Sequence, residues 1–534
     1  MTSRRLVVVV PAWMGDPAKW TPLVERLRAE HELEGSDWLI WDYSYGPVSR
    51  ASAKRIAHSL GASIHQKWVE SGGYDEILVL AHSFGGLLAR QAYLLACKQE
   101  PGFTEEWPWQ RSVTRIVLFA AINRGVDPRN KWRLRIINWM TSHIPWFTGL
   151  LVREMMRGSD FVTNLRIQWI RYFHELGERA PIVVQLLGDH DGLVTREDSI
   201  DVEQFPTTYH ATIPDADHCD LHRVDIAPDP DGRYALIRDA ILTHGAALSK
   251  DSRYMQRTKT RGPDRIVFVV HGIRAYNFGW PEQLAELIES RAPDVRAVRP
   301  TYGYLSALRF AIPTIRKLKL QWFKDQYTYW LARNPAAEFH FIGHSNGTYL
   351  LGESLRRLSA MRFHNVVLVG SVLPDDYPWD ACIGNRQVEN LRNDRSRKDF
   401  PVAVLCSGMR GLGMRDIGTG GFVGFRNALP QITEVFWYDG GHSKPLEYRN
   451  LENLADFVLT KPPIISKSRS LRSRPSSSYL RLSRWAPVLF PLIGAGILAL
   501  LFYWLFFAPV WARSCRALLA LAVFLFVAIL LDRL

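Results

Sequence analysis

The chain has 534 residues, of which 47% are hydrophobic and 22% are charged, so it is long enough for several globular domains and too apolar to be a disordered chain. Its five cysteines stand singly and none forms a Cys-x-x-Cys pair, which argues against a disulfide-rich scaffold and a cysteine-based zinc site. The net charge of +13 would suit a nucleic-acid binder, but residues 462–534 carry nine Lys and Arg against one acidic residue, and these flank apolar segments. Because this distribution is typical of a membrane anchor, we expect no nucleic-acid partner.

Two stretches of the chain share one organisation. The first opens with a β-branched run at residues 6–10 and reaches another apolar run at 77–80, and the second repeats this at 266–270 and 339–342. Helical patterns with charged faces lie between the runs. Strands that alternate with helices predict a mostly parallel α/β sheet in each stretch. The predicted boundaries are residues 1–249 for the first domain, 250–263 for a polar linker and 264–461 for the second domain.

A serine-containing turn follows the apolar run at 77–80. Residues 81–85 read AHSFG, close to the pattern G-x-S-x-G of a nucleophile elbow, the sharp strand-to-helix turn that raises a serine hydroxyl above an α/β-hydrolase sheet. Ala81 stands where the pattern has glycine, and small size is what the closed turn needs. Ser83 is therefore the predicted nucleophile of the first domain.

A nucleophilic serine needs a histidine base, and the base needs a carboxylate that orients it. In this fold the chain order is Ser, acid, His. After the apolar run at 182–187 the sequence reads Gly-Asp-His-Asp-Gly, and we predict Asp191 as the acid, with Asp189 as the alternative. His218, just past the next predicted strand, is the predicted base. Three other histidines are expected to have structural or surface roles: His190, His210 and His222.

The oxyanion of an acyl-transfer intermediate needs two backbone N–H donors. One is expected from Phe84, directly after the nucleophile. The other is expected from the loop after the first strand, residues 11–15, with Trp13 as the donor.

These motifs carry a family resemblance. The segments VVVVPAWMGDPAKW, AHSFGGLLARQAY and LFAAINRGVDP resemble the serine esterase and lipase group that includes the GPI inositol-deacylase-like hydrolases. The resemblance covers residues 5–225 and departs from the group at Ala12 and Ala81, neither of which supplies a catalytic atom. Between residues 123 and 178 lies an insertion rich in Trp, Ile, Met and Arg. We interpret this insertion as an apolar lid that forms an acyl pocket, with ordinary core packing as the alternative.

The second stretch repeats the motifs. Residues 265–276 read RIVFVVHGIRAY, and Ile273 after His-Gly is an expected oxyanion donor. Residues 339–351 read FHFIGHSNGTYLL, a full G-x-S-x-G with Ser345 as the predicted nucleophile and Asn346 as the second donor. His442, which follows a predicted strand at 434–438, is the predicted base.

The acid of the second triad is less clear from the sequence. Asp399, followed by Phe-Pro-Val, repeats the spacing of Asp191 followed by Gly-Leu-Val, and it is our prediction. Asp394 and Asp416 remain alternatives. The segments GHSNGTYLL, GSVLPDDYPW and DIGTGGFVGF resemble bacterial α/β-hydrolases of uncharacterised substrate, over residues 264–458.

The end of the chain is basic and then apolar. Residues 462–485 form a predicted basic juxtamembrane linker, and residues 486–534 a predicted transmembrane hairpin with apolar runs at 486–510 and 517–531. The first run is long enough to cross a bilayer; the second is short, so a single span with a re-entrant tail is the alternative. The basic stretch before the first span predicts that the hydrolase domains lie in the cytoplasm.

Together these features predict a membrane-anchored serine esterase or lipase with two Ser-His-Asp triads, acting on an ester or lipid through an acyl-enzyme and without a metal or organic cofactor. Two other functions fit the same residues. One is a membrane-bound sensor or adaptor that uses the hydrolase folds to bind a ligand or a partner. The other is an acyltransferase that passes the acyl group to an acceptor other than water. The oligomeric state is left open.

Overall fold

The structure is a computed structural model of residues 1–534. It describes residues 4–43, 45–46, 49–100, 102–126, 151–193, 205–255, 262–273, 279–301, 303, 306, 309–310, 312–435, 437–460, 471–472 and 474–507.

The chain divides into two compact units: residues 1–262 with 327–336, and residues 263–326 with 337–534. This puts the boundary after Gly262, within the predicted linker at 250–263. The start of that linker packs on the first unit, because Met255 and His210 exchange backbone hydrogen bonds of 2.9 and 3.1 Å and the Tyr254 hydroxyl donates to Leu236 O at 2.6 Å.

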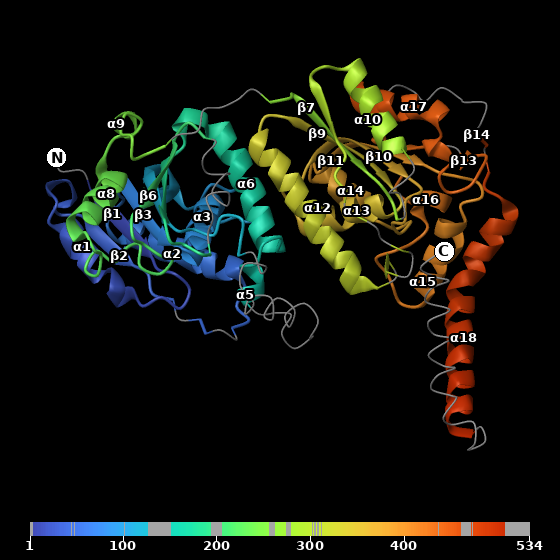
Figure 1. The fold of residues 1–534 in the computed structure, drawn as a ribbon, viewed down its shortest axis with the longest axis horizontal. Helices are drawn as coiled ribbons and strands as arrows, with labels where there is room; N and C mark the ends of the chain where they lie inside the picture. The colour runs from blue at the N-terminus through green and yellow to red at the C-terminus, as the bar shows by residue number, and fades with distance from the viewer. Residues whose placement is uncertain are drawn as a thin grey trace. The chain divides into compact units, whose positions relative to one another are not determined.

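The first unit is a parallel sheet covered by helices (Figure 1). The described strands follow the order β2-β1-β3-β4-β5-β6, and every neighbouring pair is parallel. The elements of this unit are β1 (Arg5–Val10), η1 (Pro17–Trp20), α1 (Thr21–Arg28), η2 (His31–Leu33), β2 (Asp37–Ile40), α2 (Ala53–Glu70), β3 (Glu76–His82), α3 (Phe84–Ala96), η3 (Pro108–Ser112), β4 (Val113–Phe119), α5 (Leu151–Glu154), α6 (Asp160–Leu176), η5 (Gly177–Arg179), β5 (Ile182–Gly188), β6 (Thr208–Ile213), α8 (Pro230–Leu242) and α9 (Gly245–Leu248).

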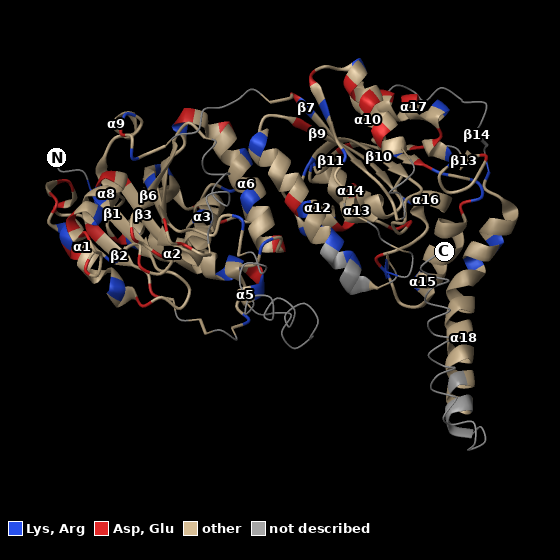
Figure 2. Ribbon diagram, in the orientation of Figure 1, with Lys and Arg blue, Asp and Glu red and all other residues tan. Residues whose placement is uncertain are grey.

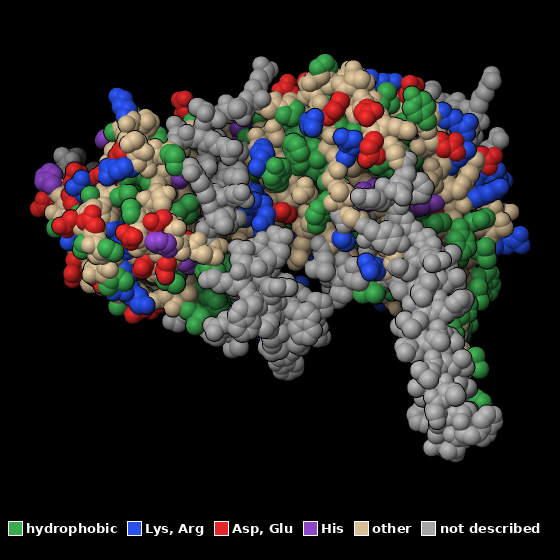
Figure 3. Space-filling model, viewed as in Figure 1, with side chains coloured by type: hydrophobic (Ala, Val, Ile, Leu, Met, Phe, Trp, Pro, Cys, Tyr) green, Lys and Arg blue, Asp and Glu red, His purple; other side chains and the backbone are tan. Residues whose placement is uncertain are grey.

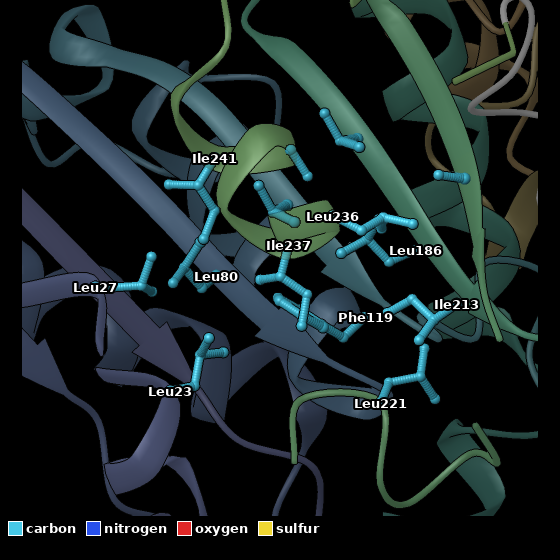
Figure 4. Close-up of a cluster of buried hydrophobic side chains, with 14 of the residues drawn as sticks. Leu23, Leu27, Leu80, Phe119, Leu186, Ile213, Leu221, Leu236, Ile237 and Ile241 are labelled. Atoms are coloured by element: carbon cyan, nitrogen blue, oxygen red, sulfur yellow. The ribbon is translucent and has the colours of Figure 1, made fainter. Parts of the chain in front are cut away.

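The hydrophobic pattern explains this layering. The β-branched run of β1 is buried from Leu6 to Val10, as expected of a central parallel strand with helices on both faces. On one face α1 and α8 bury their apolar stripes, and Figure 4 shows Leu23, Leu27 and Ile237 meeting Leu80 and the neighbouring strands in one core cluster. The apolar residues therefore fix which face each helix presents, and the carboxyl ends of the strands are left for loops.

The second unit repeats this topology. Its described strands follow the order β8-β7-β9-β10-β11-β12, the same sequence of crossovers as in the first unit, and all of these pairs are parallel. Its elements are β7 (Arg265–Val270), α10 (Trp280–Arg291), β8 (Val295–Val298), α12 (Pro313–Arg333), β9 (Glu338–His344), α13 (Asn346–Arg357), β10 (Phe363–Val369), α14 (Trp379–Gly384), β11 (Val388–Asp394), η8 (Pro401–Cys406), α15 (Ser407–Gly411), α16 (Gly420–Val423), β12 (Ile432–Glu434), β13 (Trp437–Tyr438), η9 (Lys444–Leu446), α17 (Tyr448–Leu459), β14 (Leu471–Arg472) and α18 (Ser477–Phe507). The predicted fold class, two parallel α/β sheets with flanking helices, is confirmed.

Part of the predicted membrane anchor lies within the described residues. Within the residues that the structure describes, α18 is one helix long and apolar enough to cross a membrane, over Ser477–Leu500. The second apolar run at 517–531 lies outside the described residues. The predicted linker at 462–485 also differs from the structure, because residues 471–472 pair with β13 and α18 already begins at Ser477.

Candidate active sites

The first elbow joins β3 to α3 at Ser83. This residue has φ 53° and ψ −119°, a region that side chains other than glycine rarely occupy, and its N–H donates to Phe119 O at 2.9 Å. Gly85 fits closely beneath the turn, since a Cβ there would lie 2.4 Å from Pro11 O. The strained turn therefore raises the Ser83 hydroxyl at the carboxyl edge of the sheet, as the motif predicts.

A hydrogen-bonded chain runs from this hydroxyl to a buried carboxylate. His218 Nε2 lies 2.8 Å from Ser83 Oγ, and His218 Nδ1 lies 2.9 Å from Asp191 Oδ2. The Asp191 side chain has no exposed surface, and its other oxygen accepts the Leu193 N–H at 2.8 Å. With Nδ1–H donating a hydrogen bond to the carboxylate, the imidazole can accept the serine proton at Nε2.

The alternative acid has another role. Asp189 accepts backbone N–H groups from Asp215 and Ala216 at 3.1 and 3.2 Å, so it holds the loop that leads to His218. Asp189, His190 and Asp215 also form an exposed group whose possible metal-ligand atoms lie within 4.8 Å of one another. Since both carboxylate oxygens of Asp189 already accept backbone hydrogen bonds, we assign no metal to this group.

A further histidine contacts His218, and the sequence analysis did not anticipate this contact. His82, next to the nucleophile, donates from Nε2 to the backbone oxygen of His218 at 2.7 Å. Burial, together with the nearby charge of His218, lowers the pKa of His82 to about 4, which keeps it neutral at pH 7. His222, expected to be a bystander, stacks on Trp20 with ring centroids 4.4 Å apart, and burial lowers its pKa to about 2. The His-Ser pair in the elbow was the available signal for His82.

A cavity of about 330 Å³ opens beside Ser83. Both predicted oxyanion donors, Trp13 and Phe84, line it together with Ser83 and His218. The loop that carries Trp13 is held in place by its indole N–H, which donates to Tyr45 O at 2.7 Å, and by the Tyr43 hydroxyl, which donates to Pro11 O at 2.9 Å. The remaining wall is mostly apolar and includes Ile122, Val126, Val152, Met155, Met156 and Leu193.

Part of this wall comes from the predicted lid at 123–178. Met155 and Met156 follow α5 and are buried. Ser159 caps α6 by accepting the Val162 N–H, and α6 packs on α3. Residues 127–150 of the predicted lid lie outside the described residues.

The second elbow has the same backbone geometry. Ser345 has φ 51° and ψ −115°, and its N–H donates to Val369 O at 3.0 Å. A Cβ on Gly347 would lie 2.6 Å from Val270 O, which matches the fit of the first elbow. Gly272 of the predicted oxyanion loop is close as well, since its Cβ would lie 2.8 Å from Ser345 Cβ.

The second acid and base also meet. His442 Nδ1 lies 2.8 Å from Asp399 Oδ2, the Asp399 side chain is fully buried, and its Oδ1 accepts the Val402 N–H at 3.0 Å. The last link differs from the first site: among the described residues, His442 Nε2 is buried without a hydrogen-bond partner. Ser345 itself is only 6% exposed.

The other two candidate acids are engaged elsewhere. Asp394 forms a buried ion pair with Arg392 at 2.6 Å and accepts the Tyr438 hydroxyl at 3.2 Å. Asp416 pairs with Arg316 at 2.9 Å and accepts the Tyr349 hydroxyl at 3.0 Å. Of the three carboxylates, Asp399 is the one hydrogen-bonded to His442.

The surroundings of Ser345 are polar and closed. The predicted donor Asn346 is 1% exposed, and its amide atoms have no partner within the described part of the chain, nor do the ring nitrogens of His344. His271 Nδ1 donates to Gly272 O at 2.8 Å beside the predicted donor Ile273, and residues 274–278 lie outside the description. Several buried polar groups therefore lie next to Ser345 in the second site.

Solved structures with similarity to this chain include a phospholipase, a lipase and an esterase. The phospholipase PlaB from Legionella pneumophila matches with 15% identity and a TM-score of 0.26 over 34% of this chain and 37% of PlaB, so the match spans little more than a third of that relative. A monoacylglycerol lipase from Paleococcus ferrophilus matches with 13% identity and a TM-score of 0.31, over 45% and 94% of the two chains. An esterase from Pyrobaculum calidifontis matches with 16% identity and a TM-score of 0.31, over 45% and 74%. No protein-family model and no curated protein matches the sequence.

Proposed function

We propose that the chain is a membrane-anchored serine hydrolase that cleaves carboxylic esters through an acyl-enzyme. The observation that carries the proposal is the continuous hydrogen-bonded chain from Ser83 Oγ through His218 to Asp191. An aligned hydroxyl, imidazole and buried carboxylate on a strained elbow are what nucleophilic acyl transfer needs.

The first site performs the reaction in two halves. Ser83 Oγ attacks the ester carbonyl carbon while His218 Nε2 takes its proton, and the N–H groups of Trp13 and Phe84 stabilise the oxyanion. His218 then gives this proton to the departing alcohol as the carbon–oxygen bond breaks. Water repeats the sequence on the acyl-enzyme, which releases the acid and restores Ser83. Asp191 holds the imidazole in place and stabilises its positive charge throughout.

The lining of the first cavity favours an apolar acyl group. Ile122, Val126, Met155 and Met156 offer no charge to a polar substrate, and the unbranched methionines adapt to chains of varied shape. The resemblance of residues 5–225 to serine esterases and lipases points the same way. We therefore propose a lipid or acyl ester as the substrate.

The second site carries the same set of groups in Ser345, His442 and Asp399, and we propose the same chemistry there. The step requires His442 Nε2, which has no hydrogen-bond partner among the described residues, to engage the Ser345 hydroxyl. The unpartnered Nε2 also favours a second candidate function for this unit, in which it binds a ligand without cleaving it.

We propose that α18 anchors both units to a membrane, with the apolar run at 517–531 as a second span and the units on the cytoplasmic side. Arg481 and Arg484 precede the apolar part of α18, and positive charge of this kind favours the cytoplasmic face. Figure 2 shows this basic band at one end of the helix, followed by turns without charge.

A fluorophosphonate probe on the full-length protein in membranes tests the proposal. The probe reacts only with an activated serine, so peptide mapping should find it on Ser83 and on Ser345, with each label removed by the corresponding Ser→Ala substitution. If the unsubstituted protein is labelled at Ser83 and not at Ser345, the second unit is assigned to ligand binding. If neither serine is labelled in a folded protein, the hydrolase proposal is wrong.

A further inference from the structure

The second catalytic cluster is joined to the membrane helix by a short helical segment. Asp399 is followed at once by η8 and α15, which together run from Pro401 to Gly411. At 1.5 Å per residue this segment is about 16 Å long, so its far end lies roughly that distance from the acid. Both η8 and α15 pack on α18, and Figure 1 shows α15 beside this helix.

The contact is close and specific. The Ser407 hydroxyl donates to Ser483 O at 2.6 Å. Gly408 lies against Phe490, whose ring carbons would be 2.4 Å from an added Cβ, and Gly411 lies against the backbone of Pro487. The residues of α18 on this side follow a helical spacing: Ser483, Ala486, Pro487 and Phe490. Two glycines thus let α15 sit directly on the first turns of the membrane helix.

The segment that leads into α18 also binds the loops of the acid and the base. Its strand β14 pairs with β13, four residues before His442. The Ser476 N–H donates to Arg397 O at 3.2 Å, two residues before Asp399. The Lys398 N–H in turn donates to Gly440 O at 2.9 Å, which ties the two loops to each other.

The same helix marks the level of the lipid. Arg484 and Trp485 are exposed where α18 leaves the unit, a pairing typical of the membrane interface. Beyond Pro491 the large apolar side chains are exposed, with Leu492 at 63% and Ile493 at 58%, and Figure 3 shows hydrophobic side chains along this part of the helix. Phe490 packs against Gly408 of α15, whereas the space around Gly494 further along α18 is open, so α15 lies at the level of the interface.

We propose that the carboxyl edge of the second sheet faces the lipid surface and that the second site takes its ester from the bilayer that holds α18. This deepens the esterase function proposed for the second unit and rests on it. Leu412, which follows α15, is 53% exposed, and in this arrangement we expect its side chain to contact the lipid. On a lipid surface the Leu412 side chain is removed from water, which is favourable, whereas away from a membrane it stays exposed to water.

The test uses the full chain with Ser83→Ala, reconstituted in phosphatidylcholine vesicles, so that only the second site turns over. Two substrates are compared: a fluorogenic long-chain glycerol ester embedded in the vesicles, and p-nitrophenyl butyrate in solution. Leu412→Asp should lower turnover of the embedded ester about tenfold, because the carboxylate resists the interface, and leave the soluble ester within about twofold.

Val69→Asp is the matched control. Val69 is an exposed aliphatic residue of the first unit, 58% exposed near the end of α2, and its replacement should change neither activity. An unchanged embedded-ester rate in Leu412→Asp, or an equal fall with both substrates, overturns the membrane-facing arrangement. If the Ser83→Ala parent cleaves neither ester and takes no fluorophosphonate at Ser345, the esterase proposal for this unit fails instead.

Discussion

Gly370 lies against the cluster of Ser345, His442 and Asp399, where a larger residue would clash with His442. It follows β10 with φ 53°, and an added Cβ would lie 2.7 Å from His442 Cε1 and 2.8 Å from His442 Nδ1. Ordinary contact begins near 3.4 Å, so Gly370→Ala must displace the imidazole by roughly 0.7 Å or break its 2.8 Å hydrogen bond to Asp399. Since a misplacement of about 1 Å can cost a hundredfold in rate, we expect fluorophosphonate labelling of Ser345 to slow by between about tenfold and a hundredfold.

The first unit supplies the control for backbone strain. Ala120 occupies the equivalent position after β4, with φ 43°, and its N–H donates to Leu186 O as the Gly370 N–H donates to Asp394 O. An alanine is therefore compatible with this backbone, at a cost of about 1–2 kcal/mol. Gly370→Ala should lower the free energy of unfolding by about this amount, and Ala120→Gly should leave labelling of the first site unchanged.

The labelling rates of Ser83 and Ser345 are measured in the same sample, so the first site reports the amount of folded protein. A Gly370→Ala protein that labels at Ser345 within twofold of the original rate would refute the steric argument. Such a result would mean that the His442 imidazole is not fixed in its hydrogen-bonded position next to Asp399.

Three further predictions follow from the same contacts. Asp191→Asn should slow labelling of the first site by about 10⁴-fold and leave the second site unchanged, and Asp399→Asn should do the reverse; a shared loss would contradict independent triads. Burial lowers the pKa of His82 to about 4 from the 6.5 of an unfolded histidine, so the stability that depends on neutral His82 is complete above pH 6.5 and is lost as the pH falls towards 4. Denaturant titrations should show the free energy of unfolding falling by on the order of 3 kcal/mol over this range. His82→Gln should reduce this dependence on pH. Gly408→Leu should loosen α15 from α18 and increase proteolysis of this region, whereas Gly494→Leu, with open space around its Cβ, should not; equal cleavage of the two proteins would rule out the close contact.

The sequence predicts the fold well because both sheets have strong local signals. The short β-branched runs of β1 and β7 favour buried strands, and each elbow pattern requires a strand before it and a helix after it. The prediction of Asp399 used its likeness to Asp191 in spacing, and both carboxylates accept a backbone N–H from a residue just downstream. Local patterns of this kind are visible along the chain.

Other features depend on contacts between distant residues. The His-Ser pair places His82 in the elbow but does not indicate that its ring binds the backbone of His218. Asp189 could be separated from Asp191 only once its backbone partners were known. The contact of Gly408 with Phe490 joins a loop after the acid to the membrane helix. Composition predicts that this helix spans a membrane and gives no sign that one of its faces packs against the second unit.

The two elbows have a consequence for how this protein could change. Ser83 and Ser345 both hold a backbone conformation that glycine adopts freely and that costs a side chain on the order of 1–3 kcal/mol. Replacing either serine by glycine would thus relieve this backbone strain, raise the free energy of unfolding and remove the nucleophile at that position. The backbone at this position does not oppose the loss of the serine. If the second unit had only a structural role, we would expect substitution to glycine at position 345, where this chain has serine.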